Sequence, residues 1–340
     1  MPTTDPIKRG VSLYTFQEEY FHRKMTLEDI LAACAKIDVR GIEIIGDQMI
    51  PRYPDISDEF VKAWHGWLDK YELTPVCLDM FLDWNKYVGR QMTFDERVDS
   101  VKRDIVNANR LGCTVIRVIH DVEPVLLEKL IPSAEKYGVT LALEVHAPSD
   151  LDSPLEQRLI ELFDKVQTPY LGFTIDLGIY CKRLPRVVSD RFLREGMSPA
   201  LTQYLIEAYD TNSLPHAGDE GPGKESLAEK VIKRGGREKD IYLAYMGTHM
   251  IYSNPRRLLD YMKHIKHFHG KFYEMLPDNT EYSIPYEEII PVLREGHYSG
   301  YIDSEYEGQR WIDDVSEVDS LEQVRRHHAM LKNLLEKYKA

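Results

Sequence analysis

Eight short runs of apolar and β-branched residues alternate with longer segments of helical periodicity along almost the whole chain. This alternation limits the fold more than any other feature, because it is typical of parallel sheets whose strands are joined by helices. The predicted strands are Val11–Tyr14, Ile42–Ile45, Pro75–Leu78, Val115–Ile119, Thr140–Val145, Leu171–Ile175, Ile265–His269 and Gly300–Ser304. Eight such units can close into a barrel. An open doubly wound sheet is the alternative, but this chain has no GxGxxG turn after a strand that would support it. We therefore predict an α/β fold, a (β/α)8 TIM barrel.

Helix signals fill the segments between these strands. Thr26 with Asp29 forms an N-cap arrangement related to the capping box, and Gly112 and Gly138 end two helices. The predicted helices are Thr26–Asp38, Asp58–Tyr71, Phe94–Leu111, Pro124–Tyr137, one that opens at Ser153 and Pro154, and a final one over about Asp319–Lys337.

The stretch from about Leu184 to Asp240, between the sixth and seventh strands, departs from this repeat. It is rich in Pro and Gly at Pro215–Gly223 and Gly235–Gly236, and it contains one helix-like piece, Ser198–Asp210. We predict that residues 1–340 form a single domain in which this insertion is a lid over the barrel mouth or a subunit interface. A tolerated surface excursion is the alternative.

The charge balance narrows the class of partner. With 43 Lys and Arg residues against 56 Asp and Glu residues, the chain has a formal net charge of -13. An acidic surface repels phosphate backbones and anionic lipid headgroups, so we expect neither nucleic acid nor a membrane as a partner. A small neutral substrate, or one whose charge meets a local metal ion, fits better.

Cysteine usage and the N-terminal composition bear on the compartment. Cys34, Cys77, Cys113 and Cys181 lie far apart and form no CxxC pair, so no disulfide framework is expected. The first ten residues lack the apolar run of a signal peptide, and no stretch of about 18 apolar residues predicts a transmembrane helix. We expect a cytoplasmic protein.

Four consecutive predicted strands end in a potential metal ligand. The fifth strand ends at Glu144, the sixth at Asp176, the seventh at His269 and the eighth at Glu305. Active sites of such barrels lie at the carboxyl ends of the strands, and neighbouring strands are about 4.8 Å apart. Each acid alone is more often a helix cap or a salt-bridge partner, and a lone His is more often structural. The coincidence on four strand ends favours a shared site.

Three carboxylates at one point would repel one another, and a divalent cation removes that repulsion. One imidazole with three carboxylates is a mostly oxygen site, which suits Mn²⁺, Mg²⁺ or Co²⁺ better than a thiolate-preferring metal. Zn²⁺ stays an open alternative.

Strand periodicity adds a candidate acid/base group. His146 lies two residues beyond Glu144, so both side chains point to the same side of the strand and into the same cavity. A histidine there can exchange protons near neutral pH, although it could instead only bind a ligand carboxylate. His267 is better interpreted as a packing residue or as support for a ligand. Further candidates for substrate contacts, which could equally be buried ion pairs, are Glu43, Asp79, Arg117, His120 and Lys271.

These residues carry a resemblance to the xylose isomerase-like barrels of sugar isomerases and epimerases. The matching segments are GIEII at 41–45, LALEVHAP at 141–148, GFTIDLG at 172–178, HFHGK at 267–271 and GYIDSEYEG at 300–308. The resemblance implies one divalent metal ion bound by Glu144, Asp176, His269 and Glu305, with Glu305 rather than Glu307 as the ligand of the last strand.

Two departures set the chain apart from ketose 3-epimerases of that superfamily. Those enzymes usually have Pro after the Glu of strand five, where this chain has Val145 and His146. They also have a substrate-binding His soon after the Asp of strand six, whereas Leu177–Tyr180 of this chain contain no histidine. The Glu-x-His step, the long insertion and SLYTFQEEYF at 12–21 look more like the catalytic alpha subunit of bacterial C-glycoside deglycosidases. That resemblance implies 3-oxo-glycoside substrates, Mn²⁺ and a smaller beta subunit in a hetero-oligomer.

The predicted activity is proton abstraction next to a carbonyl, followed by loss of the aglycone from a 3-oxo-C-glycoside. His146 would remove the proton, and Glu144 and Glu305 would be ligands with catalytic roles. A sugar isomerase or epimerase, in which those two glutamates act as acid and base, is the alternative. A nuclease of the same superfamily fits poorly with a charge of -13. A non-catalytic sugar-binding or assembly protein would show no turnover with any metal.

Overall fold

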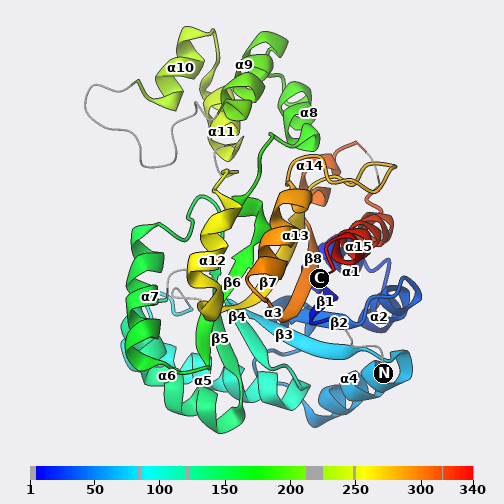
Figure 1. The fold of residues 1–340 in the computed structure, drawn as a ribbon, viewed down its shortest axis with the longest axis vertical. Helices are drawn as coiled ribbons and strands as arrows, with labels where there is room; N and C mark the ends of the chain where they lie inside the picture. The colour runs from blue at the N-terminus through cyan, green and yellow to red at the C-terminus, as the bar shows by residue number, and fades with distance from the viewer. Residues whose placement is uncertain are drawn as a thin grey trace.

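Eight parallel strands form a closed barrel in the order in which they occur along the chain (Figure 1). The computed structural model describes residues 5–82, 86–119, 122–211, 225–247, 250–315 and 317–339. The strands are β1 (Ile7–Ser12), β2 (Gly41–Ile45), β3 (Thr74–Met80), β4 (Val115–Val118), β5 (Thr140–Val145), β6 (Leu171–Asp176), β7 (Ile265–Phe272) and β8 (Gly300–Tyr306). This architecture confirms the predicted TIM barrel.

Helices surround this barrel and connect its strands. Those that follow β1 to β5 are α1 (Gln17–Phe21), α2 (Leu27–Lys36), α3 (Gly46–Met49), α4 (Asp58–Tyr71), α5 (Phe94–Leu111), α6 (Pro124–Tyr137) and α7 (Pro154–Val166). Those that follow β6 to β8 are α8 (Arg186–Arg194), α9 (Pro199–Asp210), α10 (Leu227–Lys233), α11 (Glu238–Gly247), α12 (Leu258–Tyr261), α13 (Tyr286–Glu295), α14 (Gln309–Ile312) and α15 (Ser320–Lys337).

Local sequence signals explain where several of these helices begin and end. Thr26 and Asp29 form the full capping box of α2, in which each side chain accepts from the other residue's backbone N–H. Gly112 ends α5 with a φ of 80°, a left-handed conformation that glycine adopts without strain. The bounds predicted for α4, α5 and α6 are confirmed to the residue.

The first strand was predicted four residues too late. It runs over Ile7–Ser12 rather than from Val11 to Tyr14, and Leu13–Phe16 form a turn of 3-10 helix instead. The reason is that the polar residues Lys8 and Arg9, which are not fully buried, follow Ile7 and break the apolar run expected of a barrel strand.

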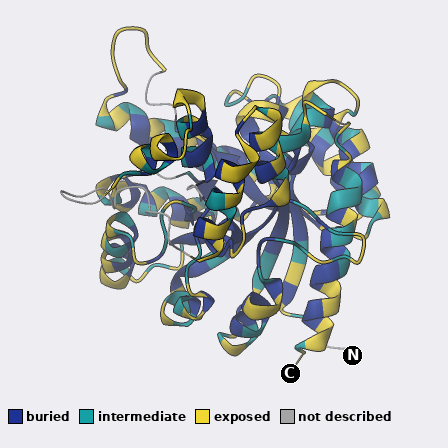
Figure 2. Ribbon diagram, turned by 90° about the horizontal axis from the view of Figure 1, so that it is seen from above, coloured by how far each residue is buried: buried dark blue, intermediate teal, exposed yellow. Residues whose placement is uncertain are grey.

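Buried residues are concentrated in the strands and on the inner faces of the helices, whereas the outer faces are exposed (Figure 2). The strands from β4 to β7 contribute Ile116, Leu141, Phe173 and Phe268, each fully buried. Cys34, Cys77, Cys113 and Cys181 are free and buried, as expected from their spacing. None of the helices in the described part of the chain is long and apolar enough to cross a membrane.

The segment between β6 and β7 includes α8 to α11, which stand together at one end of the barrel (Figure 1), and then α12. The sequence predicted only α9. Salt bridges from Arg191 and Arg194 of α8 to Asp314, at 2.8 and 2.9 Å, tie this lobe to the segment after α14. The Pro- and Gly-rich stretch Pro215–Gly223 lies outside the described residues.

Strand register sets the positions from which the site is built. Asp176 pairs with His269 across β6 and β7, and Lys271 pairs with Glu305 across β7 and β8. Glu144 pairs with Thr174, two residues before Asp176, so its side chain starts one layer lower in the barrel. Side chains from non-neighbouring strands can therefore meet inside the barrel.

Candidate active site

Three of the four predicted metal ligands meet at one point inside the barrel. The Nδ1 atom of His269 lies 2.8 Å from Oε1 of Glu144 and 3.2 Å from Oε2 of Glu305. The potential ligand atoms of these three side chains all lie within 4.8 Å of one another. All three side chains are buried, so water competes little with a cation bound there.

Arg117 lies on the other side of Glu144. Its Nε atom is 3.6 Å from Oε2 of Glu144, and its guanidinium also forms a close salt bridge with Asp79, in which Nη2 donates to Oδ2 at 2.8 Å. Burial raises the pKa of Glu144, but the charges of Arg117 and His269 outweigh burial and hold the pKa well below its usual value. Glu144 is therefore ionised, as a metal ligand must be.

Asp176 reaches the cluster through Lys271. The Nζ atom of Lys271 lies 3.1 Å from Oδ2 of Asp176 and 2.9 Å from Oε2 of Glu305. The other oxygen of Asp176 accepts a hydrogen bond from the backbone N–H of Gly178 at 2.7 Å. Burial raises the pKa of Asp176 to about 6, although the ammonium of Lys271 opposes that rise. The carboxylates of Asp176 and Glu305 thus share the ammonium group of Lys271.

The donor set fits a divalent cation. Two buried atoms in the cluster, Nδ1 of His269 and Oε2 of Glu305, make ion pairs but no contact with the geometry of a hydrogen bond among the described residues. Burial lowers the pKa of His269, yet the carboxylates of Glu305, Glu43 and Glu144 hold it well above its usual value. A positive charge at this point, whether a proton or a metal ion, is therefore strongly stabilised, and one nitrogen with several carboxylate oxygens suits Mn²⁺, Mg²⁺ or Co²⁺.

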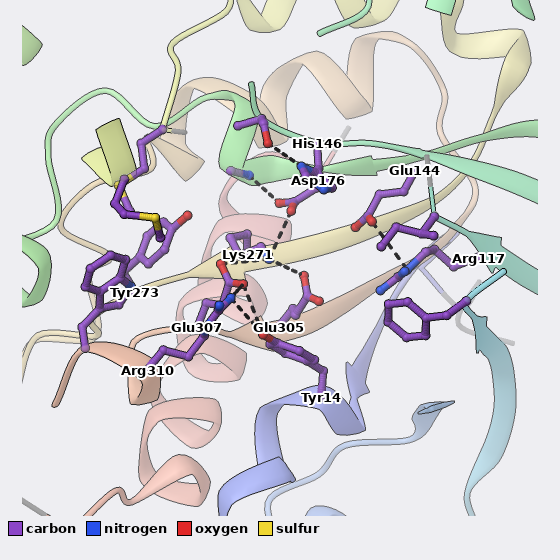
Figure 3. A pocket seen from close by; sticks show the side chains of 17 residues that line it. Tyr14, Arg117, Glu144, His146, Asp176, Lys271, Tyr273, Glu305, Glu307 and Arg310 are labelled. Carbon is purple, nitrogen blue, oxygen red and sulfur yellow. Dashed lines mark hydrogen bonds and ion pairs between the residues drawn. The ribbon is translucent and has the colours of Figure 1, made fainter. Parts of the chain in front are cut away.

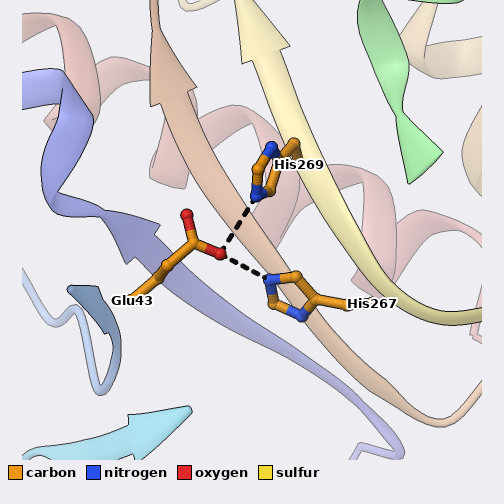
Figure 4. Close-up of side chains that lie close together, drawn as sticks. All are labelled: Glu43, His267 and His269. Atoms are coloured by element: carbon orange, nitrogen blue, oxygen red, sulfur yellow. Dashed lines mark hydrogen bonds and ion pairs between the residues drawn. The ribbon is translucent and has the colours of Figure 1, made fainter. Parts of the chain in front are cut away.

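Glu43 and His267 lie behind this cluster (Figure 4). Oε2 of Glu43 lies 3.0 Å from Nε2 of His269 and 3.2 Å from Nε2 of His267. Burial raises the pKa of Glu43, but the two histidines outweigh it and hold the pKa well below its usual value. Glu43, His267 and His269 also have the spacing of a metal-binding group. Two neighbouring groups, which share His269, could thus hold a metal ion.

His267 is flanked by a second carboxylate. Its Nε2 atom lies 3.2 Å from Oδ2 of Asp303 as well as 3.2 Å from Glu43. Burial lowers the pKa of His267, but the charges of Asp303 and Glu43 raise it to about 9. The two carboxylates therefore favour the cationic form of the His267 ring, with a proton on each nitrogen, in the metal-free protein.

A cavity of about 340 Å³ opens above the cluster (Figure 3). Its polar lining is Arg117, Glu144, His146, Asp176, Lys271, Glu305, Glu307 and Arg310. Its apolar and aromatic lining is Tyr14, Phe81, Ile119, Ala147, Met246, Met250, Tyr273 and Trp311. The cavity therefore combines a charged base with an apolar and aromatic wall, an arrangement suited to a ligand with one polar and one apolar part.

The tautomer of His146 follows from its backbone contact. Nδ1 of His146 lies within hydrogen-bond distance of the carbonyl oxygen of Ala147, and a carbonyl only accepts. Nδ1 therefore carries the proton, and in the neutral ring Nε2 has the lone pair. A neutral imidazole in this state can take up a proton, as a general base requires.

Three further polar groups in the cavity, Glu307, Tyr14 and Arg310, had no predicted role. Glu307 accepts from Tyr14 Oη at 3.4 Å and from Arg310 at 3.1 Å, and its other oxygen lies 3.3 Å from Lys271. Glu307 follows Glu305 by two residues, so strand alternation could have placed it on the same side. Tyr14 and Arg310 come from a 3-10 turn and a short helix, where no such periodicity is available.

The other predicted substrate contacts are distributed differently. Arg117 and Lys271 line the cavity, whereas Glu43 is fully buried and does not belong to the described cavity lining. His120 lies outside the described residues. Asp79 is held by Arg117 in the barrel interior.

Comparisons with known proteins place these residues in a family context. Residues 31–181 match the model of a family described as xylose isomerase-like TIM barrel. The 3'-dehydrocarminate deglycosidase alpha subunit of Microbacterium sp is 29% identical over 96% of this chain and 94% of its own. The C-glycoside deglycosidase alpha subunit of Microbacterium trichothecenolyticum is 31% identical over 89% of this chain and 84% of its own.

Solved structures share the fold at lower sequence identity. A sugar phosphate isomerase/epimerase from Parabacteroides distasonis has a TM-score of 0.55 at 15% identity, and the match covers 98% of this chain and 96% of that one. The IOLI protein with a binding zinc atom has a TM-score of 0.56 at 15% identity over 98% of this chain and 99% of its own. At these identities the likeness concerns the fold alone.

Proposed function

Because the chain belongs to the xylose isomerase-like TIM barrels and, within them, to the family of C-glycoside deglycosidase alpha subunits, we propose that it cleaves the C–C glycosidic bond of 3-oxo-C-glycosides. The observation that carries the proposal is the cavity in which His146 lines the same wall as the cluster of Glu144, Asp176 and Glu305. A base beside a cation site is the arrangement that proton abstraction next to a ketone requires.

Glu144, Asp176, His269 and Glu305 would hold the metal ion. One divalent cation, with Mn²⁺ as our assignment, would supply electrostatic stabilisation for the negative charge that develops when the carbon next to a ketone loses its proton. Lys271 lies 2.9 Å from Glu305 and lines the cavity, so its ammonium is placed to donate to a hydroxyl or carbonyl oxygen of the sugar.

His146 is the proposed base. Its Nε2 takes the proton from C2 of the 3-oxo sugar, and the C–H electron pair forms the enolate between C2 and C3. The enolate then restores the C3 carbonyl, a double bond forms between C1 and C2, and the bond from C1 to the aglycone breaks. The aglycone carbon takes up one proton, so the proton count balances and no water is consumed.

The apolar wall supports an aromatic aglycone. Phe81, Trp311, Met246 and Met250 line the cavity together with its charged groups. Flat aromatic rings pack well against such side chains, and methionine adapts to varied ring shapes. Met246 belongs to α11, so we propose that the insertion after β6 forms part of the substrate wall and acts as a lid.

A smaller beta subunit is the proposed partner, since the relatives named above are alpha subunits. The alternative activity is isomerisation or epimerisation of a sugar, with Glu144 and Glu305 as acid and base. It is favoured by one observation, that both carboxylates line the cavity themselves.

The test is aglycone release from a 3-oxo-C-glycoside by Mn²⁺-loaded protein, purified with whatever co-purifies from its host. We expect release that a chelator stops and that added Mn²⁺ restores. If no aglycone is released, and keto sugars take up deuterium from heavy water while they stay intact, the assignment changes to a sugar isomerase or epimerase. No turnover of any kind with any metal ion would overturn both.

A further inference from the structure

We infer that Glu43 is a positioning residue, which fixes the ring of His269 so that Nδ1 points at the metal-binding cluster. This inference rests on the proposed metal site. Glu43 thus supports His269, whereas the sequence alone left a substrate contact and a buried ion pair as equal alternatives for it.

The two ring nitrogens of His269 have different surroundings. Nε2 lies 3.0 Å from Oε2 of Glu43, whereas Nδ1 lies 2.8 Å from Oε1 of Glu144. A carboxylate can only accept a hydrogen bond, so Nε2 is the nitrogen that carries the proton towards Glu43. When a metal ion takes the place of a proton on the side of Glu144 and Glu305, the ring is neutral and its lone pair is on Nδ1.

Glu43 is itself held in place. It comes from β2, which β8 and β1 separate from β7 in the closed barrel, and is fully buried. Its Oε2 atom also receives a hydrogen bond from Nε2 of His267 at 3.2 Å, and His267 is flanked by Asp303. Asp303 in turn packs against Gly10, where a Cβ atom would lie only 1.9 Å from Oδ1 of Asp303. The network therefore has no room to swing.

This arrangement matches a general feature of metal-binding histidines. Their second nitrogen usually donates to a carboxylate, which fixes the tautomer and orientation of the ring and raises its basicity. Loss of such a partner typically lowers metal affinity by about 10–100-fold. A second metal site built from Glu43, His267 and His269 is the competing interpretation, since these atoms have the required spacing.

The test is Mn²⁺ titration of the metal-free protein and of the variants Glu43→Gln and Glu43→Ala. Binding is monitored by the electron paramagnetic resonance signal of free Mn²⁺. We expect one ion per chain in all three proteins. The dissociation constant should rise about 10–100-fold in Glu43→Ala and less in Glu43→Gln, whose amide oxygen can still accept from Nε2. Asp104→Asn serves as the control, because Asp104, on α5, is a buried carboxylate that accepts a hydrogen bond from Tyr53.

Two results would overturn the inference. Unchanged affinity in both folded Glu43 variants would show that the contact does not tune the site. Two ions per wild-type chain, falling to one in Glu43→Gln, would make Glu43 a ligand. A measurement on the wild type covers variants that fail to fold: in Mg²⁺-loaded protein labelled with ¹⁵N-histidine, long-range NMR should report the His269 proton on Nε2. A proton on Nδ1 would contradict the inference.

These measurements use no substrate. Aglycone release could therefore fail while Glu43 still tunes Mn²⁺ affinity, which would leave the inference standing and remove the proposed reaction. Release in Glu43→Ala at saturating Mn²⁺ with unchanged affinity would do the opposite.

Discussion

The Nδ1 atom of His269 lies 2.8 Å from Oε1 of Glu144, although the two residues come from strands that are not neighbours, β7 and β5. Asp176, on the strand between them, lies in register with His269 but pairs with Lys271 instead. The barrel thus brings a nitrogen and several carboxylate oxygens to one buried point, and each prediction below depends on that convergence.

Glu305 and Glu307 should separate into a metal ligand and a substrate contact. Glu305 lies 3.2 Å from His269, whereas Glu307 pairs with Arg310 and Tyr14 at the cavity wall. We expect Glu305→Gln to weaken Mn²⁺ binding by more than about 100-fold, beyond the usual effect of an outer partner. Glu307→Gln is the matched control and should retain Mn²⁺ affinity while KM rises. Equal loss of metal in both variants would contradict this division, as measured by Mn²⁺ titration.

His146 should be required for turnover but not for metal binding. We expect His146→Ala to lower kcat by about 10²–10⁴-fold, the usual contribution of a general base. Its Mn²⁺ content, measured by metal analysis after dialysis, should equal that of the wild type. A variant that loses metal together with activity would make His146 structural. A variant that still interconverts ketoses would favour the isomerase or epimerase.

Lys271 should stabilise the metal-free protein and oppose metal binding. Its ammonium lies between Asp176 and Glu305, where a divalent cation would also be attracted. In Lys271→Met the carboxylates lose their buried partner, so the free energy of unfolding without metal should fall by about 3–5 kcal/mol. Mn²⁺ should then raise Tm more than in the wild type. Thermal unfolding with and without Mn²⁺ measures both effects, and an equal rise in Tm in the two proteins would count against this role.

Acid should destabilise the fold through two buried histidines of α15. Burial holds the pKa of His327 well below its usual value, and that of His328 at about 3. In the unfolded chain both regain a pKa of about 6.5. The stabilisation is therefore complete above pH 6.5 and is lost as pH falls towards 3, because the unfolded chain binds the extra protons.

Each of these histidines should cost up to about 1.4 kcal/mol of stability for each pH unit below 6.5. Denaturant unfolding at pH 7.5, 6.5 and 5.5 measures the slope. His328→Gln keeps a donor for the Gly10 carbonyl. It should lower the slope of the free energy of unfolding against pH by the contribution of about one proton. An unchanged slope in this variant would show that His328 is already protonated in the folded state.

The sequence predicts much of this site because barrel strands are regular. The apolar runs locate β5 to β8, although β7 and β8 continue to Phe272 and Tyr306, beyond their predicted ends, and the order of the strands then places Glu144, His269 and Glu305 together. The same regularity fails at β1, whose polar first residues hide the strand. It fails again in the insertion, where short helices follow no barrel repeat.

Contacts across the barrel cannot be predicted in this way. Glu43 and His269 meet inside the barrel although β8 and β1 separate their strands, β7 and β2, and the direction of each side chain depends on barrel stagger and packing. The position of the Lys271 ammonium beside Asp176, rather than in solvent, likewise depends on the surrounding carboxylates. Tyr14 and Arg310 come from irregular segments, so only the folded chain reveals that they meet Glu307.

The most direct test of the central claim is anomalous X-ray diffraction at the manganese absorption edge from crystals of the Mn²⁺-loaded protein. We predict one strong peak per chain, within bonding distance of His269 Nδ1 and of oxygens of Glu144, Asp176 and Glu305. A peak on the side of Glu43 and His267, or full occupancy without any contact to Glu144 and Glu305, would contradict the account.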